Sequence, residues 1–110
     1  MKLLPLVVCA DGFTMSVQAH GGAYCSPRAN DAERYDEVEI GFPNESEPLI
    51  LQYMEGGSSS TWSEDGAEPD PTQSVYPYVP SSVVNLVLAK HGGMVAGEVP
   101  PGVAELRASE

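Results

Sequence analysis

Apolar and polar residues alternate strictly over residues 13–20, a pattern typical of a half-buried β-strand. An apolar run over residues 3–10 precedes this stretch. The Asp11-Gly12 pair between them is favoured in two-residue type I′ turns, because both turn positions need positive φ. The pattern therefore predicts an N-terminal β-hairpin. Its expected facing pairs are Ala10 with Phe13, Val8 with Met15, and Leu6 with Val17.

A second alternation covers residues 35–42 and predicts another strand, which Pro43 ends. Its expected inward residues are Val38, Ile40 and Phe42, with Asp36 on the same face near the edge of the strand. Its expected outward residues are Tyr35, Glu37 and Glu39. Residues 49–54 form a fourth strand candidate, more apolar and therefore more buried. Residues 74–80 are expected to follow in extended form.

A short amphipathic helix is predicted to start at Pro80 or Ser81, with Ser81 or Ser82 capping its first turn. Lys90 and His91 lie in the last turn, where cations suit the helix dipole. The Gly92-Gly93 pair after it suits a left-handed C-cap. The expected apolar face comprises Val83, Val84, Leu86, Val87 and Leu88.

These elements predict an α+β domain over residues 1–93. Three to five antiparallel strands would begin with the hairpin, and the C-terminal helix would pack on one face of the sheet. Residues 56–73 are rich in Gly, Ser, Pro and acid, which predicts a flexible loop. Trp62 in this loop either packs back on the domain or serves as an exposed anchor for a partner. Residues 94–110 are expected to be a partly ordered tail.

The composition agrees with one small, soluble, globular domain. The chain has 110 residues, of which 42% are hydrophobic and 19% charged. No apolar run approaches the ~20 residues of a membrane-spanning helix. The N-terminal run is short for a signal peptide and contains Pro5, so a first strand is the preferred interpretation.

The charge is concentrated in one stretch. The chain has a net charge of −11, and residues 31–70 carry all of it, with twelve acidic residues and Arg34 as their only base. Such a surface argues against direct binding to nucleic acid or to an anionic membrane.

Three interpretations of this acidic stretch compete. It is a solvated face that keeps the protein soluble, a surface that docks on a basic partner, or a divalent-metal site. The metal interpretation is the weakest, because residues 64–66 match only a fragment of a calcium loop. The candidate partner-binding residues are Asp31, Glu33, Asp36, Glu37, Glu39, Glu45, Glu47 and Trp62.

The sequence offers no catalytic motif, and we expect neither an enzyme nor a cofactor. Cys9 and Cys25 form no CxxC pair, and two reduced, buried thiols are preferred over a disulfide. A Cys25 pair with His20 or His91 lacks a third, orienting residue. The same four residues lack the short spacing of a structural zinc site.

Several short motifs resemble a group of small proteins of unknown function from tailed bacteriophages and prophages. The motifs are residues 9–19, 24–28, 38–43 and 75–93. The resemblance implies a small accessory protein in the host bacterial cytoplasm, with reduced cysteines. Anti-CRISPR inhibitors include small acidic phage proteins of similar size and charge. This comparison is an analogy between kinds of protein and not a motif match.

The function expected from charge and resemblance together is inhibition of a host nucleic-acid-handling defence complex. An acidic, DNA-mimicking face would bind a basic protein surface, with CRISPR–Cas as the leading partner. The alternative is a non-enzymatic phage structural or accessory protein that self-assembles or binds virion components.

Overall fold

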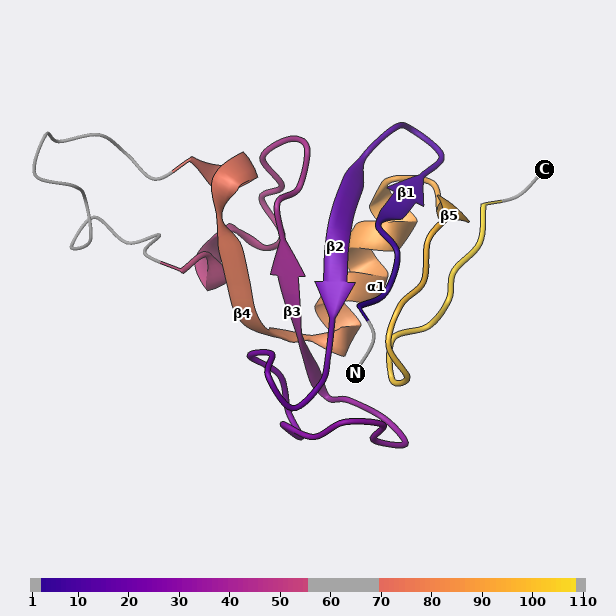
Figure 1. Ribbon diagram of the computed structural model, residues 1–110. Coiled ribbons are helices and arrows are strands. Elements are labelled where there is room, and N and C mark those ends of the chain that lie inside the picture. Colours follow the sequence, from indigo (N-terminus) through magenta and orange to yellow (C-terminus); the bar gives the residue numbers. More distant parts are fainter. Residues whose placement is uncertain (1–2, 56–69, 109–110) are drawn as a thin grey trace, which may run out of the picture.

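The computed structural model describes residues 3–55 and 70–108. Five strands form one antiparallel sheet in the order β4-β3-β2-β1-β5, with a helix packed on it (Figure 1). The elements are β1 (Val7–Cys9), β2 (Thr14–Gln18), β3 (Glu37–Gly41), β4 (Val75–Pro80), α1 (Ser81–Lys90) and β5 (Met94–Ala96). The predicted α+β class is confirmed, including the N-terminal hairpin and the helix on the sheet. None of the helices in the described residues has the length and apolar character needed to span a membrane.

The core lies between α1 and one face of the sheet. Val38 and Ile40 of β3 are fully buried together with Val84 and Leu88 of α1. The helix runs from edge strand β4 to edge strand β5 and so connects the two edges of the sheet (Figure 1). The opposite face of the sheet is formed by the strand residues that point away from α1.

The C-terminal end of α1 is as predicted. Gly92 donates its N–H to the Ala89 carbonyl, and Gly93 donates to the Leu88 carbonyl at 2.8 Å. These two bonds form a Schellman motif, which satisfies carbonyls that would otherwise lack partners. His91 is the C-cap residue, so its position follows directly from this helix end.

The expected serine cap at the other end is wrong. Pro80 is the N-cap residue, and no side chain caps the first turn. The Ser81 hydroxyl instead donates to the Tyr35 carbonyl, which is 46 residues away in the chain. The apolar face is also narrower than expected, because Leu86 is 57% exposed.

The predicted hairpin forms, but its register differs by one residue. Val7 pairs with Met15, and Val8 pairs with Thr14. The turn has three residues rather than two: Gly12 donates to the Cys9 carbonyl and has a φ of 95°. This geometry is a type I turn followed by a glycine bulge.

The shifted register exchanges the two faces of β1. Val7 and Cys9 are buried, whereas Leu6 and Ala10 are exposed. A one-residue slip always has this effect, because side chains alternate between the faces of a strand. Asp11 favours the longer turn, because its Oδ1 accepts the Phe13 N–H at 2.9 Å.

Two further expectations about the segment after β3 are wrong. Phe42 has a φ of 50° and an exposed side chain, so β3 ends at Gly41. The strand expected over residues 49–54 is a turn followed by the 3₁₀ helix η1 (Leu51–Tyr53). Ile50 is the one fully buried residue of this segment, and its N–H donates to the Glu47 carbonyl. The segment is therefore held by one buried side chain and not by strand pairing.

The C-terminal residues belong to the domain, so the expected boundary at residue 93 is too early. Met94 exchanges backbone hydrogen bonds with Leu106 and Ala108. Residues 106–108 thereby cover the outer edge of β5, which protects an otherwise unpaired strand.

In the expected loop, residues 71–73 form the 3₁₀ helix η3 (Pro71–Gln73), and Trp62 lies outside the described residues.

Replacing Gly102 tests the contact between the C-terminal segment and Tyr35. A Cβ at Gly102 would lie 2.3 Å from the Tyr35 carbonyl oxygen, at a φ of 103°. We expect Gly102→Ala to lower the free energy of unfolding by about 3 kcal/mol or more, measured by urea denaturation and circular dichroism. Gly12→Ala is the matched control, because its φ is 95° but no atom lies within 4 Å of its Cβ. Equal losses in the two variants would contradict the close-contact explanation.

Candidate functional site

Strand β3 places two acidic side chains on the face of the sheet away from α1. Val38 and Ile40 point into the core, so the alternating Glu37 and Glu39 point outward and are half-buried. Same-face positions on a strand are about 6–7 Å apart. The predicted outward row of these two carboxylates is therefore present.

A loop after β2 contacts one of these carboxylates. Glu39 Oε2 accepts the Tyr24 N–H at 2.8 Å, and the Tyr24 carbonyl accepts the Tyr78 N–H at 3.0 Å. Tyr78 lies at an irregularity in the β3–β4 pairing and has a φ of 52°. Glu39 is thus oriented by the loop, whereas Glu37 is not held in this way.

The same contacts produce an exposed aromatic pair that the sequence analysis did not identify. The rings of Tyr24 and Tyr78 are tilted with their centroids 6.0 Å apart, and the Arg28 guanidinium lies over Tyr24. Both tyrosines are about 40% exposed (41% and 42%). Tyr35 and Tyr76, by contrast, are core residues. The expected outward position of Tyr35 is therefore wrong, because Tyr35 precedes β3 and does not follow its alternation. The irregularity in β4 accounts for the different exposure of Tyr76 and Tyr78, which lie two residues apart and would share one face of a regular strand.

The remaining predicted acids do not form one continuous surface. Asp31, Glu33 and Asp36 are exposed in the segment that leads into β3, next to Glu37 in the chain. We call these four residues the acidic end. Glu45 lies beyond the other end of β3, in the loop that follows this strand. The only ion pair of the acidic end among the described residues joins Arg34 to Asp36 at 4.0 Å, with both side chains 75% exposed. Such a pair compensates little charge.

Glu47 is not a surface residue, so its place among the exposed acids is wrong. Its side chain is 1% exposed. Its Oε1 lies 2.6 Å from His91 Nε2, and its Oε2 accepts from the Lys90 ammonium at 2.9 Å. An acid this buried needs such partners, because an unpaired buried carboxylate is very costly.

The imidazole of His91 is bound on both sides. Its Nδ1 lies 2.6 Å from Asp11 Oδ2, opposite the contact with Glu47. The Phe13 ring stacks on it at 4.1 Å with an interplanar angle of 12°. Asp11, Glu47, Lys90 and His91 make up what we call the His91 cluster.

The cluster holds His91 in its protonated form. Burial alone would lower the pKa of His91, but the hydrogen bonds to Glu47 and Asp11 outweigh it, so the pKa is raised above 6.5. Burial alone would raise the pKa of Glu47. The Leu49 N–H, Lys90 and His91 reverse this, so its pKa is lowered below 4.5. Both shifts favour the charged forms of His91 and Glu47.

This arrangement suits a structural role better than catalysis. A histidine with both ring nitrogens bound to carboxylates has no basic nitrogen to offer a substrate. The Cys25 thiol is directed at the His20 and Pro27 carbonyls rather than at an imidazole. Both cysteines are buried and unpaired. The described residues contain no group of three or more His, Cys, Asp or Glu side chains placed to hold a metal ion.

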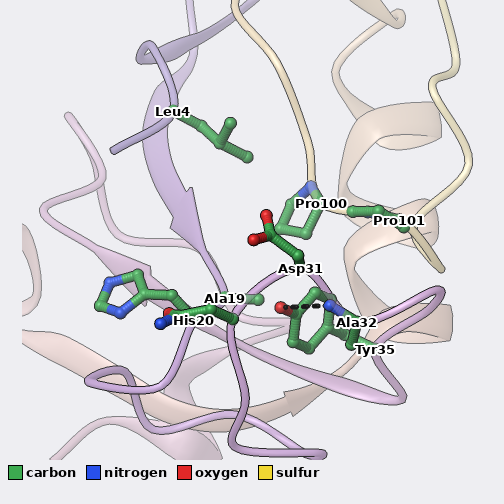
Figure 2. Close-up of a pocket in the computed structure, with 9 residues that line it drawn as sticks. Leu4, Ala19, His20, Asp31, Ala32, Tyr35, Pro100 and Pro101 are labelled. Carbon is green, nitrogen blue, oxygen red and sulfur yellow. Dashed lines mark hydrogen bonds between the residues drawn. The ribbon is translucent and has the colours of Figure 1, made fainter. Parts of the chain in front are cut away.

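A small pocket lies beside the acidic end (Figure 2). It forms where the end of β2, the turn at residues 30–32 and the Pro100-Pro101 segment meet. Its volume is about 200 Å³. Asp31 is the one predicted partner-binding residue that lines it.

Stability should depend on pH through His91. The raised pKa means that its stabilisation is complete below about pH 6.5 and is lost as pH rises through the pKa of the folded state. We expect the free energy of unfolding to fall as pH rises above about 6.5, by at most about 1.4 kcal/mol per pH unit. Chemical denaturation at a series of pH values measures this slope.

Two variants control this measurement. His91→Gln should flatten the slope, and His20→Gln, outside the cluster, should leave it unchanged. The lowered pKa of Glu47 predicts a separate loss of stability as pH falls below about 4.5, which His20→Gln should also retain. A slope that survives in His91→Gln would contradict the assignment.

The chain matches no protein-family model, no curated protein and no solved structure. We therefore interpret the acidic end and the pocket from their own geometry and charge.

Proposed function

We propose that this protein is an inhibitor that binds a basic, nucleic-acid-binding surface of another protein and excludes nucleic acid from it. The observation that carries the proposal is the acidic end, where exposed Asp31, Glu33 and Asp36 lead into outward-facing Glu37. Arg34 is the only base within residues 31–70, and its pairing with Asp36 is long and solvent-exposed. Within the part of the chain that the structure describes, this is the one ion pair of the acidic end, so its carboxylates are largely uncompensated there.

The physical basis is electrostatic complementarity. A surface that binds nucleic acid presents Lys and Arg side chains spaced to meet a row of phosphates. Carboxylates on β3 about 6–7 Å apart, with further acids beside them, offer such side chains alternative partners. Binding of this kind is fast and depends strongly on salt.

The exposed Tyr24 and Tyr78 would add contact area next to the carboxylates. Tyrosine is enriched at the centres of protein interfaces, because it supplies a large apolar surface with one polar atom. The loop that carries Tyr24 also orients Glu39. Aromatic and acidic contacts would therefore be presented by one rigid unit.

We further propose that the partner is a CRISPR–Cas effector complex and that the protein is phage-encoded and acts in the host bacterial cytoplasm. The support is the resemblance of its short motifs to small phage proteins, together with the acidic end. On this view the protein has no catalytic role and needs no cofactor.

A second candidate, a phage structural or accessory protein that self-assembles or binds virion components, has its own supporting observation. Leu6 of the segment entering β1 and Val95 of neighbouring β5 are 49% and 57% exposed. Exposed apolar side chains on adjacent strands suit contact with another protein. Light scattering over a range of concentrations tests the self-assembling form of this candidate, which predicts a concentration-dependent mass.

Charge changes on β3 test the inhibitor. With a purified Cas effector and fluorescently labelled target DNA, the wild-type protein should displace DNA, and less so as salt rises. Glu37→Lys combined with Glu39→Gln should weaken this inhibition at least about tenfold. Gln at position 39 keeps an oxygen that can accept the Tyr24 N–H, so the loop is preserved.

The matched control changes charge equally at another place. Glu98→Lys with Glu105→Gln alters two exposed acids of the C-terminal segment and should leave inhibition unchanged. If the β3 variant inhibits as well as the wild type, the acidic-surface mechanism is refuted.

A further inference from the structure

The pocket beside the acidic end has a mixed lining, in which polar and apolar surface are about equal and Asp31 is the one acidic side chain. Leu4, Ala19 and Pro100 supply apolar surface, and Asp31 supplies the carboxylate. In Figure 2 the Asp31 carboxylate projects from its backbone toward the space between Leu4 and Pro100. At about 200 Å³ the pocket is far larger than the space that one water needs. It is large enough to take an extended side chain.

The wall that carries Asp31 is held firmly. The Tyr35 hydroxyl donates to the Ala29 carbonyl at 2.6 Å and accepts the Ala32 N–H at 3.2 Å, which fixes both sides of the turn. Asp31 itself adopts a φ of 55°, a conformation that Asp tolerates better than most residues. The carboxylate is therefore presented at a defined place rather than on a loose loop.

The opposite wall is fixed by a buried amide. Gln18 accepts the Leu4 N–H at 2.8 Å through Oε1 and donates to the Leu4 carbonyl at 2.9 Å through Nε2. This pair of bonds ties the N-terminal segment to the end of β2. His20 also lines the pocket, but its Nδ1 accepts the Gly22 N–H at 3.0 Å. The His20 ring is turned toward that loop and away from Asp31 in Figure 2.

Among the described residues, no hydrogen bond or ion pair engages the Asp31 carboxylate. In this it differs from Asp11 and Glu47, which are fully used by the His91 cluster. A carboxylate in a pocket that also has apolar surface from Leu4, Ala19 and Pro100 favours a ligand with a positive head and an apolar stem. Arginine and lysine side chains have this form, and the planar guanidinium of arginine can also bond both carboxylate oxygens.

We propose that this pocket binds one cationic side chain of the partner, preferentially an arginine, with the guanidinium on Asp31 and the methylenes against Leu4 and Pro100. The inference rests on the proposed function, because it makes the pocket the anchor point of the acidic end. It adds a specific contact to an interaction that charge alone would leave without a fixed register.

The test uses small probes and the isotopically labelled full-length protein. N-acetyl-arginine methylamide is titrated while amide chemical shifts are recorded. We expect saturable shifts centred on Ala19, Asp31 and Ala32. N-acetyl-citrulline methylamide, which has the same shape without the charge, should cause at most small shifts. The lysine analogue reports whether any cation suffices.

Three variants separate pocket binding from general charge attraction. Asn tolerates the same backbone conformation as Asp, so Asp31→Asn should keep the turn but lower the affinity for the arginine probe at least about tenfold. Ala19→Leu should block binding by filling the pocket while every charge is kept. Glu33→Gln removes an exposed acid that does not line the pocket and should have little effect.

The outcomes distinguish this inference from the proposed function. Shifts spread over all surface carboxylates, equal binding of the citrulline probe, or unchanged binding in Asp31→Asn would overturn the pocket. If the arginine probe does not bind the pocket but the β3 variant still loses inhibition of the effector, the proposed inhibitor function is retained and the arginine-binding pocket is rejected. Localised probe binding together with unaltered inhibition in the β3 variant would support the pocket and refute the acidic-surface mechanism.

Discussion

The imidazolium of His91 ties together three segments that are distant in the chain. Asp11 comes from the hairpin turn, Glu47 from the loop after β3, and His91 from the end of α1. Glu47 is buried, so its carboxylate depends on the positive charges of His91 and Lys90. Removing the carboxylate or the imidazolium would leave the other charge uncompensated in the core. The three-residue turn brings Asp11 within 2.6 Å of the ring, so the hairpin register and the cluster support each other.

The two ends of the sheet treat acidic residues in opposite ways. At the end where the hairpin turn lies, carboxylates are paired with His91 and Lys90 and stabilise the fold. At the other end, the acidic end has only the exposed Arg34 contact as compensation among the described residues. Uncompensated like charges repel one another and destabilise a fold. Keeping them together on a firmly held surface is consistent with binding a basic partner.

On the proposed function, the pocket would set the register of the acidic end on its partner. Tyr35 lines the pocket, and its backbone also connects the C-terminal segment to α1 through Pro101 and Ser81. Gly102 packs directly on the Tyr35 carbonyl that accepts the Ser81 hydroxyl. The position of Asp31 therefore depends on Tyr35 and the segments packed against it as well as on its own loop, which is the kind of support that a specific contact needs.

Local patterns in the sequence determined the elements whose signals are local. The alternation at Val38 and Ile40 and the Gly92-Gly93 helix end were both predicted correctly, because each depends on neighbouring residues. The face of β1 was not, because residues 3–10 are apolar at both parities and Asp11-Gly12 fits either turn length. Tertiary structure alone decided that Glu47 is buried and that His91 binds Asp11, 80 residues away. Contacts this distant leave no periodic signal, because they form only when the strands, loop and helix have packed together.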